Sequence, residues 1–223
     1  EDVIVAKNSL IFKIMLELDM QQDVYVYDPT TSDELSRVRG VGRYLQILKE
    51  NFGDDFVFTN DLNEIPKDAT FINPFFNFLQ PPLLKRRVSR RQIAIIHDLI
   101  PLQFPKHFPT GVRGWINVYL NKRALKNYDC IITDSLASKT IIQKKLKIAG
   151  EKIKVAYPCL PKIFIAEKAL KNRGPKNNLQ LTTKDKRTVL AKFGFTEVGV
   201  WNYFIYVGDV TWNKNLLTIA RAI

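Results

Sequence analysis

The sequence has few of the residues from which metal centres and disulfide frameworks are built. It contains two cysteines, Cys130 and Cys159, and two histidines among 223 residues. Two cysteines cannot hold together a small secreted domain, and Cys130 lies in an apolar run that favours a buried thiol. The low cysteine content excludes a disulfide-rich scaffold and fits a reducing, cytoplasmic setting.

Long hydrophobic runs are also missing. No stretch of about 18 apolar residues is present, so no transmembrane helix is expected. The first residues, Glu1 to Ile4, do not combine a basic region with an apolar stretch, which argues against a signal peptide. They also lack an initiator methionine, so we expect a trimmed or internal piece of a longer protein. We predict a cytoplasmic location, with peripheral contact at the inner face of a membrane as one option.

Acidic residues are scarce in the middle of the chain. Residues 81–192 hold 25 basic and 6 acidic residues, whereas residues 1–80 hold 7 basic and 14 acidic residues. The net charge of +12 is therefore concentrated in one segment. Such asymmetry indicates an anionic partner, which could be a membrane surface, a phosphorylated substrate or nucleic acid. The alternative is a basic face that is simply solvated.

The stretch around His97 is the first candidate site. Four apolar residues, 93–96, lead directly into His97 and Asp98. A short run rich in isoleucine is typical of a buried strand in a parallel sheet. Ligands of such sheets bind just past the carboxyl ends of the strands, which is where His97 and Asp98 would stand. The alternative is that His97 only satisfies a backbone group.

A second candidate site lies near the start of the chain. Alternating residues at 23–28 predict a strand, and Gly40 and Gly42 form a Gly-x-Gly turn that leads into a helix through Leu45. Glycine lets backbone N–H groups approach an anion, and a helix N-terminus favours negative charge, so this arrangement could hold a phosphate. It is not the dinucleotide fingerprint, because Leu45 occupies the place of the third glycine. Plain turn glycines are the alternative.

The remaining pattern predicts an α/β fold with a parallel sheet. We expect further strands at 56–59, 70–72, 128–135, 152–158 and 203–207, and helices at 3–20, 110–127 and from Ser135 or Ser138 to about Leu146. A polar stretch with glycine and proline at 168–186 is typical of a linker. We therefore divide the chain into a first domain at 1–167, a linker and connecting helix at 168–200, and the start of a second α/β domain at 201–223.

Two aromatic segments each allow two interpretations. The loop at 73–82 is rich in phenylalanine and proline, and it could line a sugar or lipid pocket or be held by packing. In the helix at 110–127, Trp115, Val118, Tyr119 and Leu125 lie near one stripe, with arginine and lysine elsewhere. This stripe could rest on an anionic membrane, or it could be the core face of the helix.

Taken together, five motifs resemble those of retaining glycosyltransferases of family 4, which have the GT-B architecture of two Rossmann-like domains. They occur in the family's order and cover about residues 23–223. The matching pieces are Arg39-Gly40-Val41-Gly42-Arg43-Tyr44, Ile96-His97-Asp98-Leu99-Ile100-Pro101-Leu102 with Phe104-Pro105, Thr133-Asp134-Ser135 with Ser138-Lys139, Lys152-Ile153 with Val155 and Tyr157-Pro158, and Tyr206-Val207-Gly208 with Lys214-Asn215-Leu216.

The resemblance implies transfer of a hexosyl group, with mannosyl as first guess, from a nucleotide sugar to a glycan or lipid-linked acceptor with retention of configuration. Such an activity would serve polysaccharide biosynthesis. By this resemblance His97 contacts the sugar, Gly40 and Gly42 approach the donor, and Lys214 neutralises the diphosphate.

The acceptor side would fall to Arg43, Tyr44 and Asp98. Because lysine takes the place of a cation, neither a metal nor another cofactor is implied, and the sequence contains no Asp-x-Asp.

The chain departs from the family pattern in its second domain. Asp209 follows Gly208, and Asn213 precedes Lys214 where some relatives have arginine. The paired glutamates of the family, Glu-x7-Glu, and its nucleotide-base pocket would lie beyond Ile223. We therefore expect this 223-residue chain alone to be inactive in sugar transfer.

Two other functions remain open. A basic, non-enzymatic α/β module could bind anionic membrane or nucleic acid, although no nucleic-acid motif is present and nucleic acid is not the partner we expect. A different GT-B member, such as an epimerase, would be distinguished only by residues beyond 223.

Overall fold

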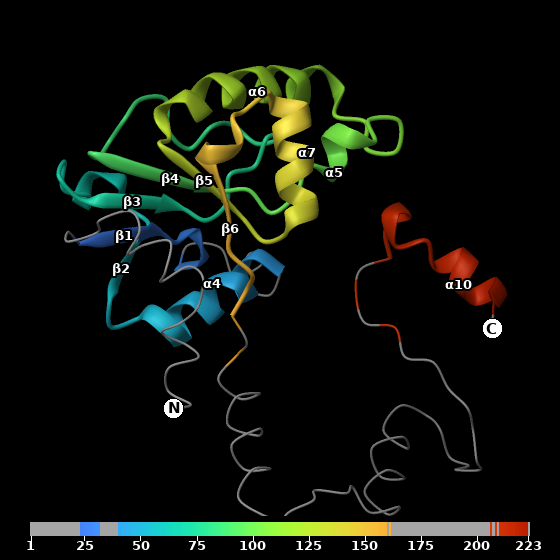
Figure 1. Cartoon of the computed structure of the whole chain (residues 1–223), viewed down its shortest axis with the longest axis horizontal. Helices are drawn as coiled ribbons and strands as arrows, with labels where there is room; N and C mark the ends of the chain where they lie inside the picture. Colours follow the sequence, from blue (N-terminus) through green and yellow to red (C-terminus); the bar gives the residue numbers. More distant parts are fainter. Residues whose placement is uncertain are drawn as a thin grey trace, which may run out of the picture. The chain divides into compact units, whose positions relative to one another are not determined.

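The structure is a computed structural model that describes residues 23–31, 40–159, 161, 206, 208 and 210–222 (Figure 1). The chain divides into two compact units, residues 1–165 and residues 166–223, and each is described by itself. The helix predicted at 3–20, the linker at 168–186 and nearly all of the strand predicted at 203–207 lie outside the described residues.

A six-stranded, all-parallel sheet forms the first unit, in the order β2-β1-β3-β4-β5-β6. Every one of these strands falls at a predicted strand, so the predicted α/β, Rossmann-like fold is confirmed. β4 begins two residues earlier than predicted, and the Ile96 N–H extends its ladder by donating to the Ile132 carbonyl at 2.9 Å. The strands are β1 (Val24–Tyr27), β2 (Phe56–Thr59), β3 (Thr70–Asn73), β4 (Arg91–Ile95), β5 (Cys130–Thr133) and β6 (Ile153–Val155).

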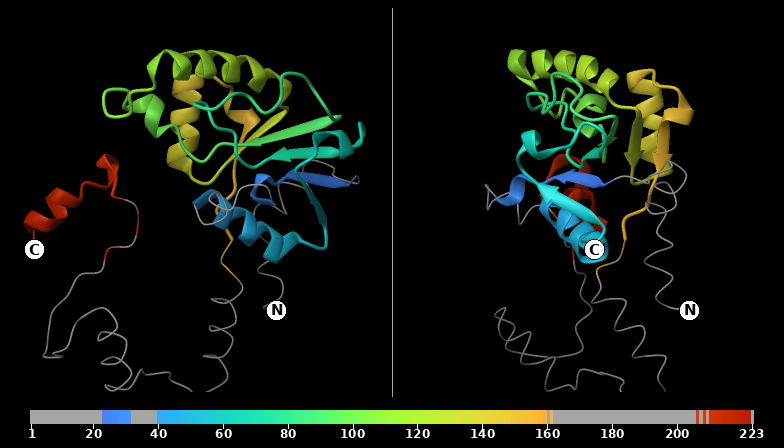
Figure 2. Two further views of the ribbon diagram at one scale, coloured as in Figure 1. Left: turned by 180° about the vertical axis from the view of Figure 1, so that it is seen from behind. Right: turned by 90° about the vertical axis from the view of Figure 1, so that its left-hand side faces the viewer.

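Helices cover both faces of this sheet (Figures 1 and 2). α4 (Gly40–Phe52) lies on one face, and α6 (Gly111–Ala124) and α7 (Leu136–Leu146) lie on the other. The short α5 (Ile100–Gln103) follows β4. The 3-10 helices of this unit are η1 (Pro29–Thr31), η2 (Leu62–Glu64), η3 (Leu125–Asn127) and η4 (Gly150–Lys152).

Two hydrophobic cores lie on opposite faces of the sheet, because successive strand side chains point to opposite sides. In β4, Ile93 and Ile95 pack toward α4, whereas Ala94 and the following Ile96 pack toward α6 and α7. Burying each isoleucine contributes about 1.5–3 kcal/mol. This explains why the run before His97 is apolar without alternation.

The predicted Gly-x-Gly turn is wrong, because Gly40 and Gly42 form the first turn of α4 itself. Leu45, Leu48 and Phe52 recur at helical spacing and are all buried. Packing of this apolar face stabilises the helix, so that it begins at Gly40 rather than after Gly42. Gly42 is buried and Gly40 is exposed. The N-terminus of the helix nevertheless remains a place where backbone N–H groups can meet an anion.

The aromatic loop at 73–82 is held by packing, which settles one of the two open interpretations. Phe76 and Phe78 are buried, and the ring of Phe76 meets that of Tyr128 edge-on at 5.3 Å. The loop's carbonyl groups need donors, and α6 supplies them. Asn117 donates to the Leu79 carbonyl at 2.8 Å, and Asn121 donates to the Gln80 carbonyl at 2.7 Å.

The aromatic stripe predicted in α6 is divided between two faces of the helix. Val118 and Leu125 are buried, as a core face requires, but Trp115 and Tyr119 are 62% and 68% exposed. The core-face interpretation is therefore wrong for the two aromatic residues. Asparagines take their place on the buried side, because the loop that packs there presents carbonyl groups rather than side chains.

Candidate functional site

The carboxyl edge of the sheet gathers polar groups from four strands. Starting from β1, the chain adds β2 on one side and β3 to β6 on the other, so the winding of the sheet changes side between β1 and β3. Ligands of doubly wound sheets bind at such a point. The groups that follow the strand ends here are Asp28 after β1, Pro74 after β3, His97 after β4 and Asp134 after β5.

His97 is the centre of this edge and is oriented by three groups. Its Nδ1 atom lies 3.4 Å from Oδ2 of Asp134, and its Nε2 atom lies 3.3 Å from the carbonyl oxygen of Pro74. The ring of Tyr44, from α4, meets the imidazole edge-on at 4.7 Å between centroids. The His97 and Asp134 side chains are 26% and 30% exposed, so both can still reach a ligand.

The first turn of α7 fixes the backbone of this cluster. Ser135 caps the helix by accepting from the Ser138 N–H at 3.1 Å. The Ser138 hydroxyl in turn donates to the carbonyl oxygen of His97 at 2.9 Å and lies 3.5 Å from Oδ1 of Asp134. One serine therefore joins the end of β4 to the end of β5.

The imidazole has acceptors on both sides. A neutral imidazole carries one N–H and donates to one of them, while the doubly protonated ring donates to both. A ligand hydroxyl that approaches the exposed edge of His97 can take over either position. The arrangement suits hydrogen bonding to a polyhydroxylated ligand, with Asp134 holding the ring in place.

Tyr44 contributes a protonated phenol beside His97. Burial raises the pKa of Tyr44, with smaller contributions from the ionisable groups of Cys159 and Asp134. The phenol therefore keeps its proton at neutral pH and can serve as a donor. Tyr44 was predicted on the acceptor side of the site, and the structure brings it together with His97.

Two other predicted residues make only local contacts near the starts of α4 and α5. Arg43 is exposed, and its guanidinium donates to Gln46 Oε1 at 3.0 Å and lies 3.7 Å from Glu50 Oε1. Asp98 is exposed and its Oδ1 accepts from the Ile100 N–H at 2.9 Å, at the start of α5. Their acceptor-binding roles stay predictions.

Lys214 belongs to the second unit. It ends the 3-10 helix η5 (Trp212–Lys214), which precedes α10 (Leu216–Ala222). Asn215 follows in a left-handed conformation with φ of 50°, and its side chain accepts from the Thr218 hydroxyl at 2.8 Å. Lys214 is exposed, and its role toward a donor diphosphate stays a prediction.

An ion pair also anchors the edge beside β1. The buried Asp28 pairs with Lys49 of α4 and accepts from the backbone N–H and hydroxyl of Thr30 at 2.8 and 2.6 Å. Burial alone would raise the pKa of Asp28, but the hydrogen bonds from Lys49 and Thr30 outweigh it and hold the pKa below its ordinary value. The ammonium of Lys49 also lies 5.3 Å from the ring centroid of Phe58. The pair ties α4 to the end of β1.

Asp134, Ser138 and Asp28 were not predicted as site residues. Asp28 and Asp134 directly follow the last residues of β1 and β5, and His97 comes two residues after the end of β4. Applying the strand-end rule to every predicted strand, rather than to one, would have brought these carboxylates into the site.

Within the ranges described, no group of three His, Cys, Asp or Glu side chains lies close enough together to hold a metal ion. None of the helices in those ranges has the length and apolar character needed to cross a bilayer. Comparisons with protein-family models, with curated proteins and with solved structures found no match to this chain.

Proposed function

We propose that this chain belongs to a retaining, nucleotide-sugar-dependent hexosyltransferase in which His97 contacts the transferred sugar. The observation that carries the proposal is the orientation of His97 at the carboxyl edge of the sheet by Asp134, the Pro74 carbonyl and Tyr44. A partly exposed imidazole held from three sides is suited to a sugar hydroxyl. The geometry supports only sugar binding, and the resemblance of the motifs to family 4 glycosyltransferases is the reason for proposing sugar transfer.

The leaving group in such a reaction is a nucleoside diphosphate. As the bond from the anomeric carbon to the diphosphate oxygen breaks, its electron pair moves onto that oxygen. The acceptor hydroxyl oxygen forms the new bond on the same face of the sugar, and its proton passes to the departing diphosphate. Fixed positive charge and backbone N–H groups stabilise the developing anion. In this proposal Lys214 and the first turn of α4, with Gly40 and Gly42, supply them, and Arg43, Tyr44 and Asp98 face the acceptor.

The test uses the full product of the natural gene and a panel of nucleotide sugars, with guanosine diphosphate mannose first. Release of nucleoside diphosphate is measured with a lipid extract as the source of acceptor. We expect release from one donor, reduced about a hundredfold by His97→Ala and by Lys214→Ala, which is the usual effect of removing one transition-state hydrogen bond or charge. His107→Ala and Arg221→Ala are the matched controls and should leave the rate within about twofold.

Three outcomes separate the alternatives. Release that neither variant affects would keep the reaction class and reject the roles of His97 and Lys214. Turnover by the isolated 223-residue chain would contradict our expectation that it is inactive. No release from any donor, by a folded protein, would overturn the proposal.

A basic binding module is the second candidate, and the excess of basic residues at 81–192 favours it. A nucleic-acid-binding module would show an affinity that falls steeply with salt, because bound cations are released from the phosphates. Absence of sugar transfer together with such binding would favour this function over the transferase.

A further inference from the structure

The outer face of α6 is apolar where a surface helix is normally polar. Val112, Trp115, Ile116 and Tyr119 follow the spacing of one helical stripe, and they are 78%, 62%, 54% and 68% exposed. The opposite stripe carries the buried residues Gly114, Asn117, Val118, Asn121 and Ala124. A contiguous set of large exposed apolar side chains marks a surface that meets another apolar phase.

The part of the chain that carries this face is basic. No acidic residue occurs between Leu99 and Tyr128, while Lys106, Arg113, Lys122, Arg123 and Lys126 all do. These five basic side chains are exposed. Lys122, Arg123 and Lys126 fall in the last turns of α6 and in η3, so the basic end adjoins the apolar stripe.

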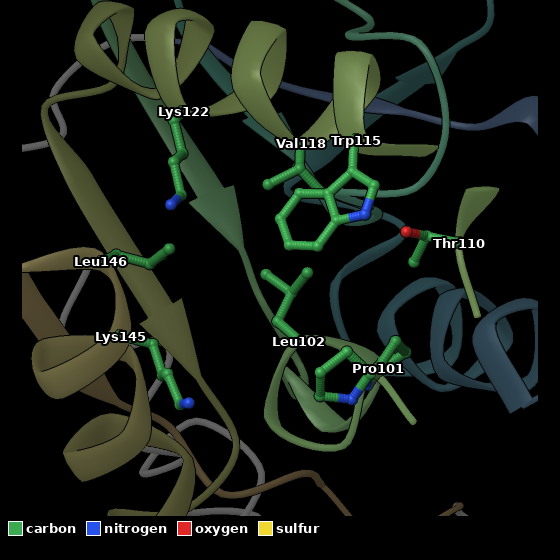
Figure 3. A pocket seen from close by; sticks show the side chains of 9 residues that line it. Pro101, Leu102, Thr110, Trp115, Val118, Lys122, Lys145 and Leu146 are labelled. Carbon is green, nitrogen blue, oxygen red and sulfur yellow. The ribbon is translucent and has the colours of Figure 1, made fainter. Parts of the chain in front are cut away.

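A hollow of about 170 Å³ opens beside the stripe, between α5, α6 and α7. Trp115 and Leu102 form its apolar side, while Lys122 and Lys145 reach in from α6 and α7 with Leu146 between them (Figure 3). This is smaller than the pockets of about 300–1,000 Å³ that take drug-sized ligands. Two ammonium groups facing apolar side chains match a phosphate that carries a hydrocarbon chain.

We propose that the α6 face, defined as Val112, Trp115, Ile116 and Tyr119 with Lys122 and Lys145 at the hollow, docks on an anionic phospholipid bilayer. Tryptophan and tyrosine favour the boundary between headgroups and hydrocarbon. Lysine beside them is attracted to anionic headgroups. α6 lies in the plane of the interface, and a lipid phosphate sits between Lys122 and Lys145.

Other occupants fit this surface less well. Nucleic acid would use the cations but would not explain exposed valine and isoleucine. A second copy of the chain would bring two sets of basic residues together, and like charges repel across an interface. The inference does not depend on the proposed transferase activity, because it rests on α6 and the hollow rather than on His97.

The test measures co-sedimentation of the 223-residue chain with vesicles of phosphatidylcholine and phosphatidylglycerol, and with vesicles of phosphatidylcholine alone. We expect binding to the mixed vesicles that weakens at high salt, and little binding to the neutral ones. The double variant Lys122→Gln with Lys145→Gln should reduce the affinity for mixed vesicles about thirtyfold, because each lysine near an anionic surface usually contributes several-fold to binding. Lys67→Gln with Lys85→Gln is the charge-matched control and should change it less than threefold.

The apolar part of the face is tested separately. Trp115→Ser with Tyr119→Ser should reduce affinity at least tenfold, whereas the exposed control pair Val57→Ser with Tyr157→Ser should not. Circular dichroism verifies that each variant is folded. In a chain where Trp115 is the sole tryptophan, brominated phospholipid should quench its fluorescence.

Several results would overturn the inference. One is equal affinity of the α6 variants and their controls for mixed vesicles. Another is Trp115 fluorescence that brominated phospholipid does not quench. A third is that the protein binds RNA but not vesicles. Vesicle binding needs no sugar donor, and donor cleavage is measured by a different product, so failure of one proposal leaves the other testable.

Discussion

α4 and α6 pack on opposite faces of the same sheet, and α6 differs in that it buries two asparagines beside Val118 and Ala124. α4 buries Leu45, Leu48 and Phe52, as an amphipathic helix does. α6 buries Asn117 and Asn121 and leaves Trp115 and Tyr119 in solvent, as described above. The difference lies in what each helix meets. α4 packs on strand side chains, whereas α6 also packs on a loop whose carbonyl groups would otherwise be unpaired.

The largest effect should come from the apolar side of α4. Leu45→Ala removes a side chain that is 1% exposed, and such a change leaves a cavity as well as losing burial. We expect the free energy of unfolding to fall by about 3 kcal/mol in a urea titration. Val57→Ala, at an exposed position, is the control and should change it by less than about 0.5 kcal/mol. Equal losses at both positions would contradict the core assignment.

Asn121→Leu sharpens the comparison, because hydrophobicity alone predicts that it stabilises α6. Asn121 donates to the carbonyl groups of Gln80, Asn117 and Phe78 at 2.7, 3.0 and 3.4 Å. Leucine would remove this donor from the Gln80 and Phe78 carbonyl groups, whereas the Asn117 carbonyl keeps its helical backbone bond, so we expect a loss of about 2 kcal/mol. Thermal and urea unfolding measure it. The change Gln46→Leu, at a half-buried position on α4 where it removes only a surface hydrogen bond from Arg43, should cost less than about 0.5 kcal/mol. A stabilised Asn121→Leu would refute the explanation.

Asp28→Asn tests the polar anchor of α4 and its dependence on pH. Because the pKa of Asp28 in the folded protein lies below its ordinary value of 3.8, the paired carboxylate stabilises the fold above that value. This stabilisation is lost as the pH falls through the lower, folded-state pKa. At neutral pH we expect Asp28→Asn to cost about 1.5 kcal/mol, at the low end for a charged hydrogen bond because Lys49 is 40% exposed.

The measurement is the free energy of unfolding of both proteins from neutral to acid pH. The difference between them should begin to shrink below about pH 4, where the carboxylate of the unfolded chain takes up a proton, and should vanish once the pH falls below the lower folded-state pKa. A difference that grows toward acid pH would show that the sign is wrong.

The smallest effect should come from the outer side of α6. Tyr119→Lys places a charge on a side chain that is 68% exposed, so the free energy of unfolding should change by less than about 0.5 kcal/mol. Urea titration of the variant and of Lys126→Gln, a neighbouring surface change, provides the comparison. A loss above about 1 kcal/mol would mean that the α6 face is covered by the chain itself.

The inner strands β3, β4 and β5 could be predicted from the sequence because each is a short apolar run that is buried on both faces. β1 could be predicted because its residues alternate. The face of α6 could not. Nothing in the spacing of Asn117 and Asn121 says that a loop some 40 residues earlier in the chain presents its carbonyl groups there. The start of α4 was missed for a related reason, since glycine favours a turn unless buried neighbours such as Leu45 extend the helix.

The candidate site was predictable in part. The strand-end rule located His97, and the structure places Tyr44 beside it. The pairing with Asp134 needs two strand ends to be neighbours, which depends on the strand order rather than on local sequence. The contact with the Pro74 carbonyl follows from the path of a loop, and loops carry no periodicity from which to infer it.

α7 has a further consequence as a spacer. Its first turn holds Ser138 against His97 and Asp134, and its last turn carries Lys145 into the hollow beside Trp115. Ser138 and Lys145 are seven residues apart, which is roughly 10 Å along an α-helix, so this rod fixes the separation between the sheet edge at His97 and the hollow. If both proposals hold, a ligand that reaches His97 from the docked bilayer would have to span about that separation.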